Sequence, residues 1–203
     1  MNFKYRIKQH INENRWQYST LAVLFLLGII LGNYQTSYLE AGVKSHLLEM
    51  IDNYLRGEQA DSLSSLNIWA GVFINQIKTL LIIWFLGLTV IGLPLILAII
   101  FVRGFSLGFT IGFLVHEKAG AGILITLLSI VPQNLVYIPL LIVWSVVAMN
   151  FSIYLVRGRT TMNLSLGRAF VVYTSLLIIC CGVLLAGSLI EAYLSPWLLS
   201  LLL

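Results

Sequence analysis

Charged residues are scarce in this chain of 203 residues. Asp, Glu, Lys and Arg together make up 10% of it, hydrophobic residues make up 59%, and the mean hydropathy is +0.94. A typical soluble domain carries about 25% charged residues, because polar surface must cover its core. The shortage excludes a secreted domain, a nucleic-acid-binding protein and an ordinary cytosolic enzyme. It predicts an all-α, polytopic membrane protein, with residues 1–203 forming a single integral membrane domain.

Recognisable catalytic and ligand-binding motifs are also missing. The sequence contains no P-loop and no G-x-G-x-x-G, and its three histidines and adjacent Cys180 and Cys181 form no metal-ligand pattern. Residues 104–108 match the G-x-S-x-G of serine hydrolases, with Ser106 at the nucleophile position. That motif requires a strand-to-helix turn and a histidine base, whereas these residues lie inside an expected membrane helix. We therefore expect no enzyme activity, no cofactor and no metal.

The N-terminal segment has the layout of a membrane anchor. Residues 1–17 carry four basic residues and one acid, and an apolar run from Tyr18 to Leu31 follows. A secretory signal peptide has a similar layout, but no small-residue cleavage site follows this run. We predict an uncleaved first span with a basic, cytoplasmic start at residues 1–17.

Residues 34–67 are the only long polar stretch, and their net charge of −3 is typical of an extracytoplasmic loop. Apolar residues recur there every three or four positions, which predicts an amphipathic helix. This helix either packs on its own membrane domain or the bilayer surface, or it docks an extracytoplasmic partner. The docking candidates are Leu39, Val43, Leu47, Glu49, Met50, Asp52 and Tyr54.

The remaining spans are separated by local signals within an almost continuous apolar block. A break at Gly92-Leu93-Pro94 and a polar turn at His116-Glu117-Lys118 divide it. The loop with Arg157, Arg159 and Arg168 has no acid, which is typical of the cytoplasmic side. The predicted spans are 18–31, 68–93, 94–115, 119–156 and 169–190. We predict five spans, with residues 119–156 forming one kinked crossing that is broken in mid-membrane near Pro132; six spans would follow if these residues crossed twice.

Two features of the third span suggest how the helices pack. Gly104, Gly108 and Gly112 repeat every four residues, so they share a helix face that lets another backbone approach closely, for packing or self-association. Arg103 lies near the middle of the span, where a charge costs at least about 2.5–3.5 kcal/mol. We expect it to face the helix bundle and contact opened backbone near Pro132. The buried polar or broken-helix candidates are Arg103, Pro132, Gln133, Asn134, Glu191 and Pro196.

Several of these segments together resemble the stage II sporulation protein M family. The resemblance rests on residues 92–94, the glycine-bearing helix, residues 129–134, and residues 190–193 with Pro196. The wider family tends to a Pro-His-Gly-x-x-Glu pattern. Here Gln133 and Asn134 replace His and Gly, and Tyr137 replaces the Glu on which a proton or ion role would depend. This departure is typical of the endospore-forming branch.

The resemblance implies a non-enzymatic scaffold for engulfment, in the mother-cell membrane at the sporulation septum. Its implied partners are the stage II sporulation D and P proteins, which are peptidoglycan hydrolases, together with membrane lipid. Self-association stays open, and no nucleic acid is expected. The alternative is a permease-like subunit of an ABC-type complex, which would require a separate ATPase.

Overall fold

The computed structural model describes residues 9–55, 65–157 and 166–189, and all regular structure in these ranges is helical. The all-α fold class is therefore confirmed. Glu191 and Pro196 lie outside the described residues. The elements are α2 (Arg15–Thr36), α3 (Ala41–Leu55), α4 (Ser65–Gly87), α5 (Gly92–Ile125), the π-helical turn η1 (Thr126–Ile130), α6 (Val131–Arg157) and α7 (Leu166–Leu189).

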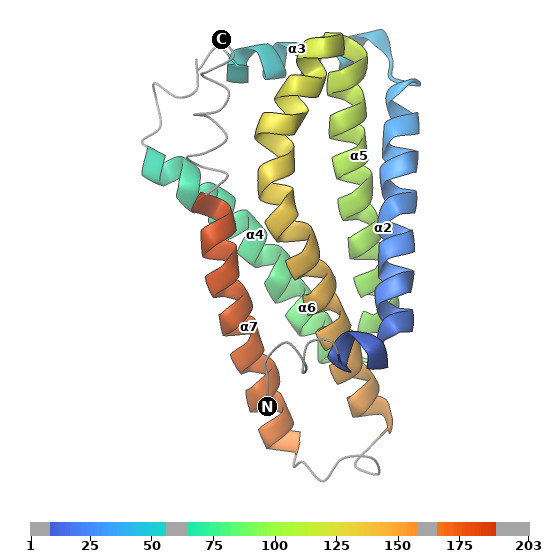
Figure 1. The fold of residues 1–203 in the computed structure, drawn as a ribbon, viewed down its shortest axis with the longest axis vertical. Helices are drawn as coiled ribbons and strands as arrows, with labels where there is room; N and C mark the ends of the chain where they lie inside the picture. The colour runs from blue at the N-terminus through green and yellow to red at the C-terminus, as the bar shows by residue number, and fades with distance from the viewer. Residues whose placement is uncertain (1–8, 56–64, 158–165, 190–203) are drawn as a thin grey trace.

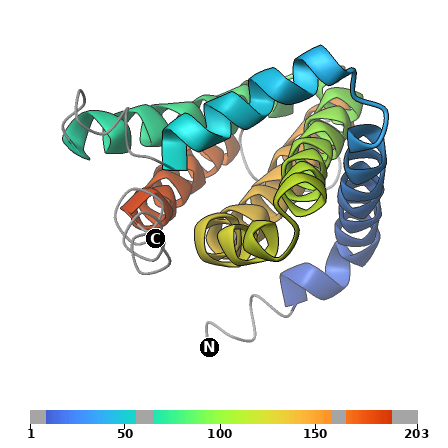
Figure 2. The same cartoon turned by 90° about the horizontal axis from the view of Figure 1, so that it is seen from above.

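Five of the helices run along the length of the molecule, and each reverses the direction of the one before it. Figure 1 shows α2 rising, α4 descending, α5 rising, α6 descending and α7 rising. α3 lies across one end of the body, as the view from above also shows (Figure 2). The start of α2 and the start of α7 share the opposite end.

Three helical stretches in the described ranges are long and apolar enough to cross a membrane. They are Arg15–Thr36, Gly92–Val156 and Leu166–Leu189, and Phe73–Gly87 is a shorter apolar helix. The 65-residue stretch Gly92–Val156 does not run straight, because the chain folds back at Ala119, where φ is +46°. The reversal follows directly after the polar turn expected at residues 116–118.

The boundary between α4 and α5 differs from the expected break. α4 ends at Gly87, so the span predicted to reach Leu93 is too long by about one and a half turns. α5 begins at Gly92 and includes Pro94 in its first turn, where a proline removes no helical hydrogen bond. Gly92 lies directly against the Leu86 backbone, which leaves no room for a side chain in this tight connection.

The break expected near Pro132 is a π-helical turn rather than an opened helix. Residues Thr126–Ile130 form this turn, and α6 continues directly from it at Val131. Pro132 has no N–H to donate to the preceding carbonyls, which accounts for a local change in hydrogen bonding here. The Asn134 side chain donates to the Ile130 carbonyl oxygen over 2.7 Å. The middle of the body is therefore continuous helix.

An aromatic cluster fills the body near the α4–α5 turn. The Tyr173 ring stacks on Phe151 at 4.3 Å and on Trp144 at 5.3 Å between centroids. Trp144 is fully buried and donates from Nε1 to the Leu80 carbonyl over 3.1 Å. The Tyr173 hydroxyl donates to the Trp84 carbonyl over 3.0 Å, near the end of α4. Helices α4, α6 and α7 are thus joined at this end.

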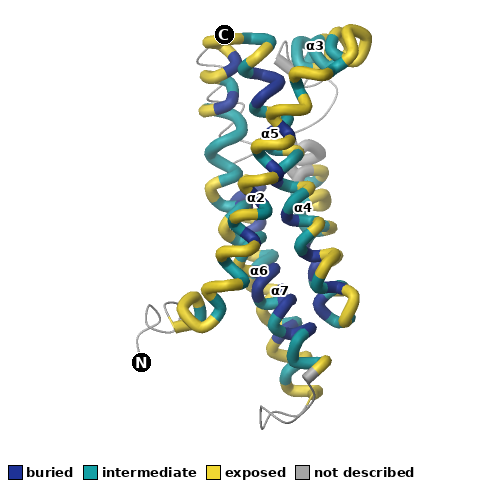
Figure 3. Tube along the Cα trace, turned by 90° about the vertical axis from the view of Figure 1, so that its right-hand side faces the viewer, coloured by how far each residue is buried: buried dark blue, intermediate teal, exposed yellow. Residues whose placement is uncertain are grey.

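Exposed positions recur along the helices (Figure 3), and many of them carry large apolar side chains. On α7, for example, Ile178 is 69% exposed, and on α4, Phe85 is 62% exposed. An exposed apolar surface of this extent is typical of a membrane-facing one.

Candidate functional site

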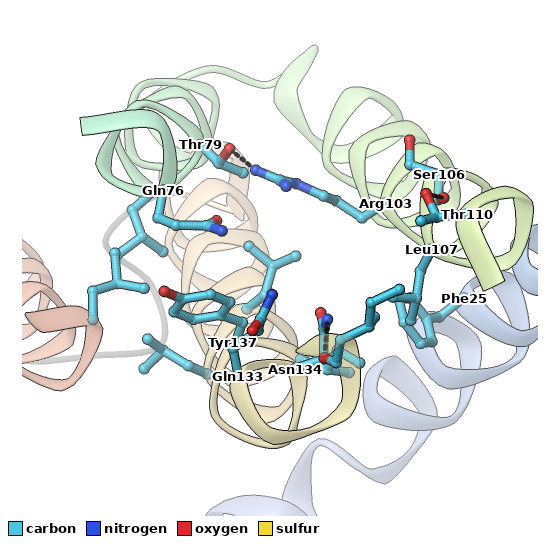
Figure 4. Close-up of a pocket in the computed structure, with 16 residues that line it drawn as sticks. Phe25, Gln76, Thr79, Arg103, Ser106, Leu107, Thr110, Gln133, Asn134 and Tyr137 are labelled. Carbon is cyan, nitrogen blue, oxygen red and sulfur yellow. Dashed lines mark hydrogen bonds between the residues drawn. The ribbon is translucent and has the colours of Figure 1, made fainter. Parts of the chain in front are cut away.

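A polar cavity of about 270 Å³ lies between α2, α4, α5, α6 and α7. Figure 4 shows polar side chains pointing into it from α4, α5 and α6. Hydroxyl and amide groups commonly hydrogen-bond between membrane helices, whereas a charged side chain inside a membrane body is rare and often functional. The polar lining residues are Gln76, Thr79, Arg103, Ser106, Thr110, Gln133, Asn134 and Tyr137.

Arg103 is half-buried and reaches across the cavity from α5 to α4. Its Nη2 donates a short hydrogen bond to the Thr79 hydroxyl (Figure 4). The expected partner was opened backbone near Pro132, but that segment is helical, and Gln133 and Asn134 instead border the same cavity. Thr79 was not among the predicted residues. The signal for it was the helical spacing of Gln76 and Thr79, which places both residues on one face of the span.

The cavity holds the serine of the G-x-S-x-G match but no group that would activate it. The described residues that line it include no His, Cys, Asp or Glu. His10 precedes α2, His46 lies on α3 and His116 lies near the Ala119 reversal, so none of them borders Ser106. Within the described ranges, no group of three or more His, Cys, Asp or Glu residues is placed to hold a metal ion. The cavity lining therefore provides hydroxyl and amide groups for hydrogen bonding and the positive charge of Arg103.

The three glycines of α5 lie against the backbone of α2. Gly104 meets Phe25, Gly108 meets Ile29 and Gly112 meets Asn33. At each of these three glycines, an added Cβ atom would overlap α2. Two glycines of α2 complete the seam: Gly28 and Gly32 meet the backbone of α5 near Phe101 and Phe105. We did not single these two out, although Gly28-x-x-x-Gly32 is a recognised packing motif. The glycine face of α5 is therefore covered by α2 of the same chain.

Helix α3 lies over the end of α5 that is near the Ala119 reversal, and part of its apolar stripe borders a hollow between the two helices. Leu47, Met50 and Ile51 line a hollow of about 280 Å³ with Phe109 and Phe113 of α5. This contact corresponds to the first of the two interpretations of the amphipathic helix. Much of α3 nevertheless remains open, since Val43 is 47% exposed and Met50, which borders the hollow, is still 57% exposed.

Two ion pairs fix α3 beside the Ala119 reversal. Lys44 lies 2.8 Å from Glu117, and Lys118 lies 2.5 Å from Asp52. Asp52, one of the docking candidates, is therefore engaged within the chain.

The other docking candidates are distributed around α3. Val43 and Glu49 are exposed and Leu39 is half-buried, whereas the Tyr54 side chain lies outside the described residues.

One comparison with known proteins identifies the family. The family model described as Stage II sporulation protein M matches residues 21–196, which include most of α2, all of α3 to α7 and the whole cavity lining. The chain belongs to the stage II sporulation protein M family. Its membership confirms the resemblance and makes it a membrane protein of sporulation engulfment. No curated protein and no solved structure matches the chain.

Proposed function

We propose that this member of the stage II sporulation protein M family is a non-enzymatic membrane scaffold. It recruits and positions the stage II sporulation D and P peptidoglycan hydrolases at the septum, in the mother-cell membrane. The observation that carries the proposal is the placement of α3, which lies across one end of the body, is joined to the end of α5 by two ion pairs and leaves much of its surface exposed. A fixed amphipathic helix at the surface can hold a partner in a defined position.

The orientation that we propose has five spans and a cytoplasmic N-terminus. Arg15 at the start of α2 and Arg168 at the start of α7 lie at the same end of the body. Basic residues favour the cytoplasmic side, so α3 and the Ala119 reversal lie at the extracytoplasmic end. This places the exposed edge of α3 on the side of the membrane where peptidoglycan is.

A second candidate function, a permease-like subunit, is favoured by one observation. The polar cavity beside Arg103 lies inside the helical body, and polar groups at such depth often mark a transport pathway. That role requires a separate ATPase, and it predicts a partner on the cytoplasmic end of the molecule rather than on α3.

The localisation of the hydrolases in sporulating cells tests the scaffold. Fluorescently tagged hydrolases should concentrate at the septum when this chain is present and spread over the membrane when it is deleted. Glu49→Lys is the suitable variant, because Glu49 is exposed, whereas reversing Asp52 would also break its pair with Lys118. We expect Glu49→Lys to lower septal recruitment several-fold.

The matched control is Glu13→Lys, which makes the same charge change at an exposed residue near the opposite end. Normal septal recruitment with Glu49→Lys, at equal protein levels, would remove α3 as the dock. Unchanged hydrolase localisation in the deletion strain would contradict the scaffold itself.

A further inference from the structure

A groove of about 620 Å³ runs between α4 and α5, beside the polar cavity. Its walls include exposed apolar side chains from both helices: Ile82 is 53% exposed and Val102 is 57% exposed. The apolar lining residues are Ile82, Leu86, Leu95, Ala98, Ile99 and Val102. The polar lining residues are Asn75, Thr79, Arg103 and Ser106. Three of the polar residues also line the cavity, so the groove and the cavity meet at Arg103.

The polar part of the groove lies deep within the body. At 1.5 Å per residue, Arg103 is about 16 Å along α5 from Gly92 and about 21 Å from Glu117. The hydrocarbon core of a bilayer is about 30 Å thick, so Arg103 lies near its middle in the orientation proposed above. Lipid offers no hydrogen-bonding group at this depth, yet Asn75 and Ser106 are exposed here.

We propose that this groove binds a single membrane-spanning helix of a partner protein. A carboxylate or carboxamide side chain near the middle of that helix faces Arg103 and Thr79. The inference rests on the proposed function, because the partner it implies is the membrane anchor of a recruited hydrolase. It adds a second contact, inside the membrane, to the extracytoplasmic contact at α3.

The groove fits a helix better than a phospholipid. The phosphate groups of lipids lie near the two surfaces of the bilayer, and their acyl chains carry no acceptor for a guanidinium group. A helix can place a carboxylate or amide oxygen at mid-depth, where an arginine hydrogen bond to a carboxylate is stronger than in water. Ala98, the smallest residue in the lining, lets another backbone come close to α5.

Photo-crosslinking tests where the partner helix lies. The full-length chain, with a photoreactive residue in place of Val102, is co-expressed with the full-length D and P hydrolases and irradiated in membranes. The matched control places the same residue at Ile178, which is exposed on α7 and outside the groove lining. We expect a protein adduct with the membrane anchor of a hydrolase from position 102 and none from position 178.

The outcomes separate the groove from the proposed function. The hydrolases could co-purify with the chain but crosslink equally at both positions, or only at position 178. That result would contradict helix binding in the groove and leave the scaffold role intact. An adduct of lipid mass alone at position 102, with hydrolase bound, would also overturn it. Failure of any hydrolase to co-purify would instead contradict the proposed function.

Filling the groove gives an independent test. Ala98→Trp places a large side chain in the groove, and Ala186→Trp makes the same change at an exposed position on α7. We expect Ala98→Trp to lower hydrolase co-purification about tenfold, as the loss of one important interface contact does, and Ala186→Trp to leave it unchanged. Equal retention by both variants, each with a normal elution profile in detergent, would exclude the groove.

Discussion

Two opposite faces of α5 meet very different surroundings. One carries Gly104, Gly108 and Gly112, which lie against the backbone of α2 with no space for a side chain. The other carries Arg103, Ser106 and Thr110, which border the polar cavity. The first face is complete within the chain, whereas the second leaves a hollow beside a charged group.

The glycine face of α5 therefore stabilises the fold, whereas the polar face is available to bind a partner. Close backbone contact drives helix association in membranes, because lipid removes the hydrophobic advantage that helices have in water. A charge at mid-membrane costs at least about 2.5–3.5 kcal/mol, so Arg103 works against stability. We therefore expect changes on the glycine face to affect folding, and changes on the polar face to affect binding.

The largest effect should come from adding a side chain on the glycine face. Gly108→Leu forces α2 and α5 apart, and we expect it to lower the free energy of unfolding by about 3 kcal/mol. Thermal unfolding in detergent, followed by tryptophan fluorescence, measures this change. Gly182→Leu is the control, because Gly182 lies on α7 with open space around its Cα. Equal losses from both substitutions would show that the seam has no special role.

Replacing the charge on the polar face should change binding more than stability. Arg103→Met removes the half-buried charge and keeps most of the side-chain volume, so we expect an unfolding temperature equal to or above that of the wild type. Co-purification of the hydrolases should fall about tenfold, as for an interface hot spot. Arg103→Lys, which keeps the charge, should retain part of it. A large fall in unfolding temperature with Arg103→Met would mean that both faces of α5 serve the fold.

The smallest effect should appear where α5 meets α3. The Lys118–Asp52 pair is partly exposed, and such pairs contribute about 0.2–1 kcal/mol. Lys118→Asp alone should weaken the attachment of α3, and Lys118→Asp with Asp52→Lys should restore it. Proteolysis rates of α3 in the two variants measure this attachment. No difference between them would exclude the ion pair as its source.

The sequence predicted where α5 begins and reverses better than it predicted which helices contact α5. The chain reversal beside the polar residues 116–118 and the glycine repeat were both visible, because charge and residue size are local properties, although residues 116–118 are themselves helical. The contact between Arg103 and Thr79 was not, since it depends on which helices lie side by side. Apolar residues that face lipid and apolar residues that face protein look alike in a membrane sequence, so periodicity does not identify the neighbour.

The middle of the chain shows the same limit. Pro132 indicated irregular backbone, and a π-helical turn does precede it. How the chain accommodates a missing N–H, by opening or by a local π turn, depends on the packing around it. Asn134, which donates to the Ile130 carbonyl, contributes to a continuous helix.

The scaffold role is tested most directly by identifying the proteins that this chain binds in sporulating cells. The tagged chain is purified in mild detergent from sporulating membranes, and co-purifying proteins are identified by mass spectrometry. We expect the D and P peptidoglycan hydrolases to co-purify without a dedicated ATPase. An ATPase in their place would contradict the scaffold and make the cavity beside Arg103 part of a transport pathway.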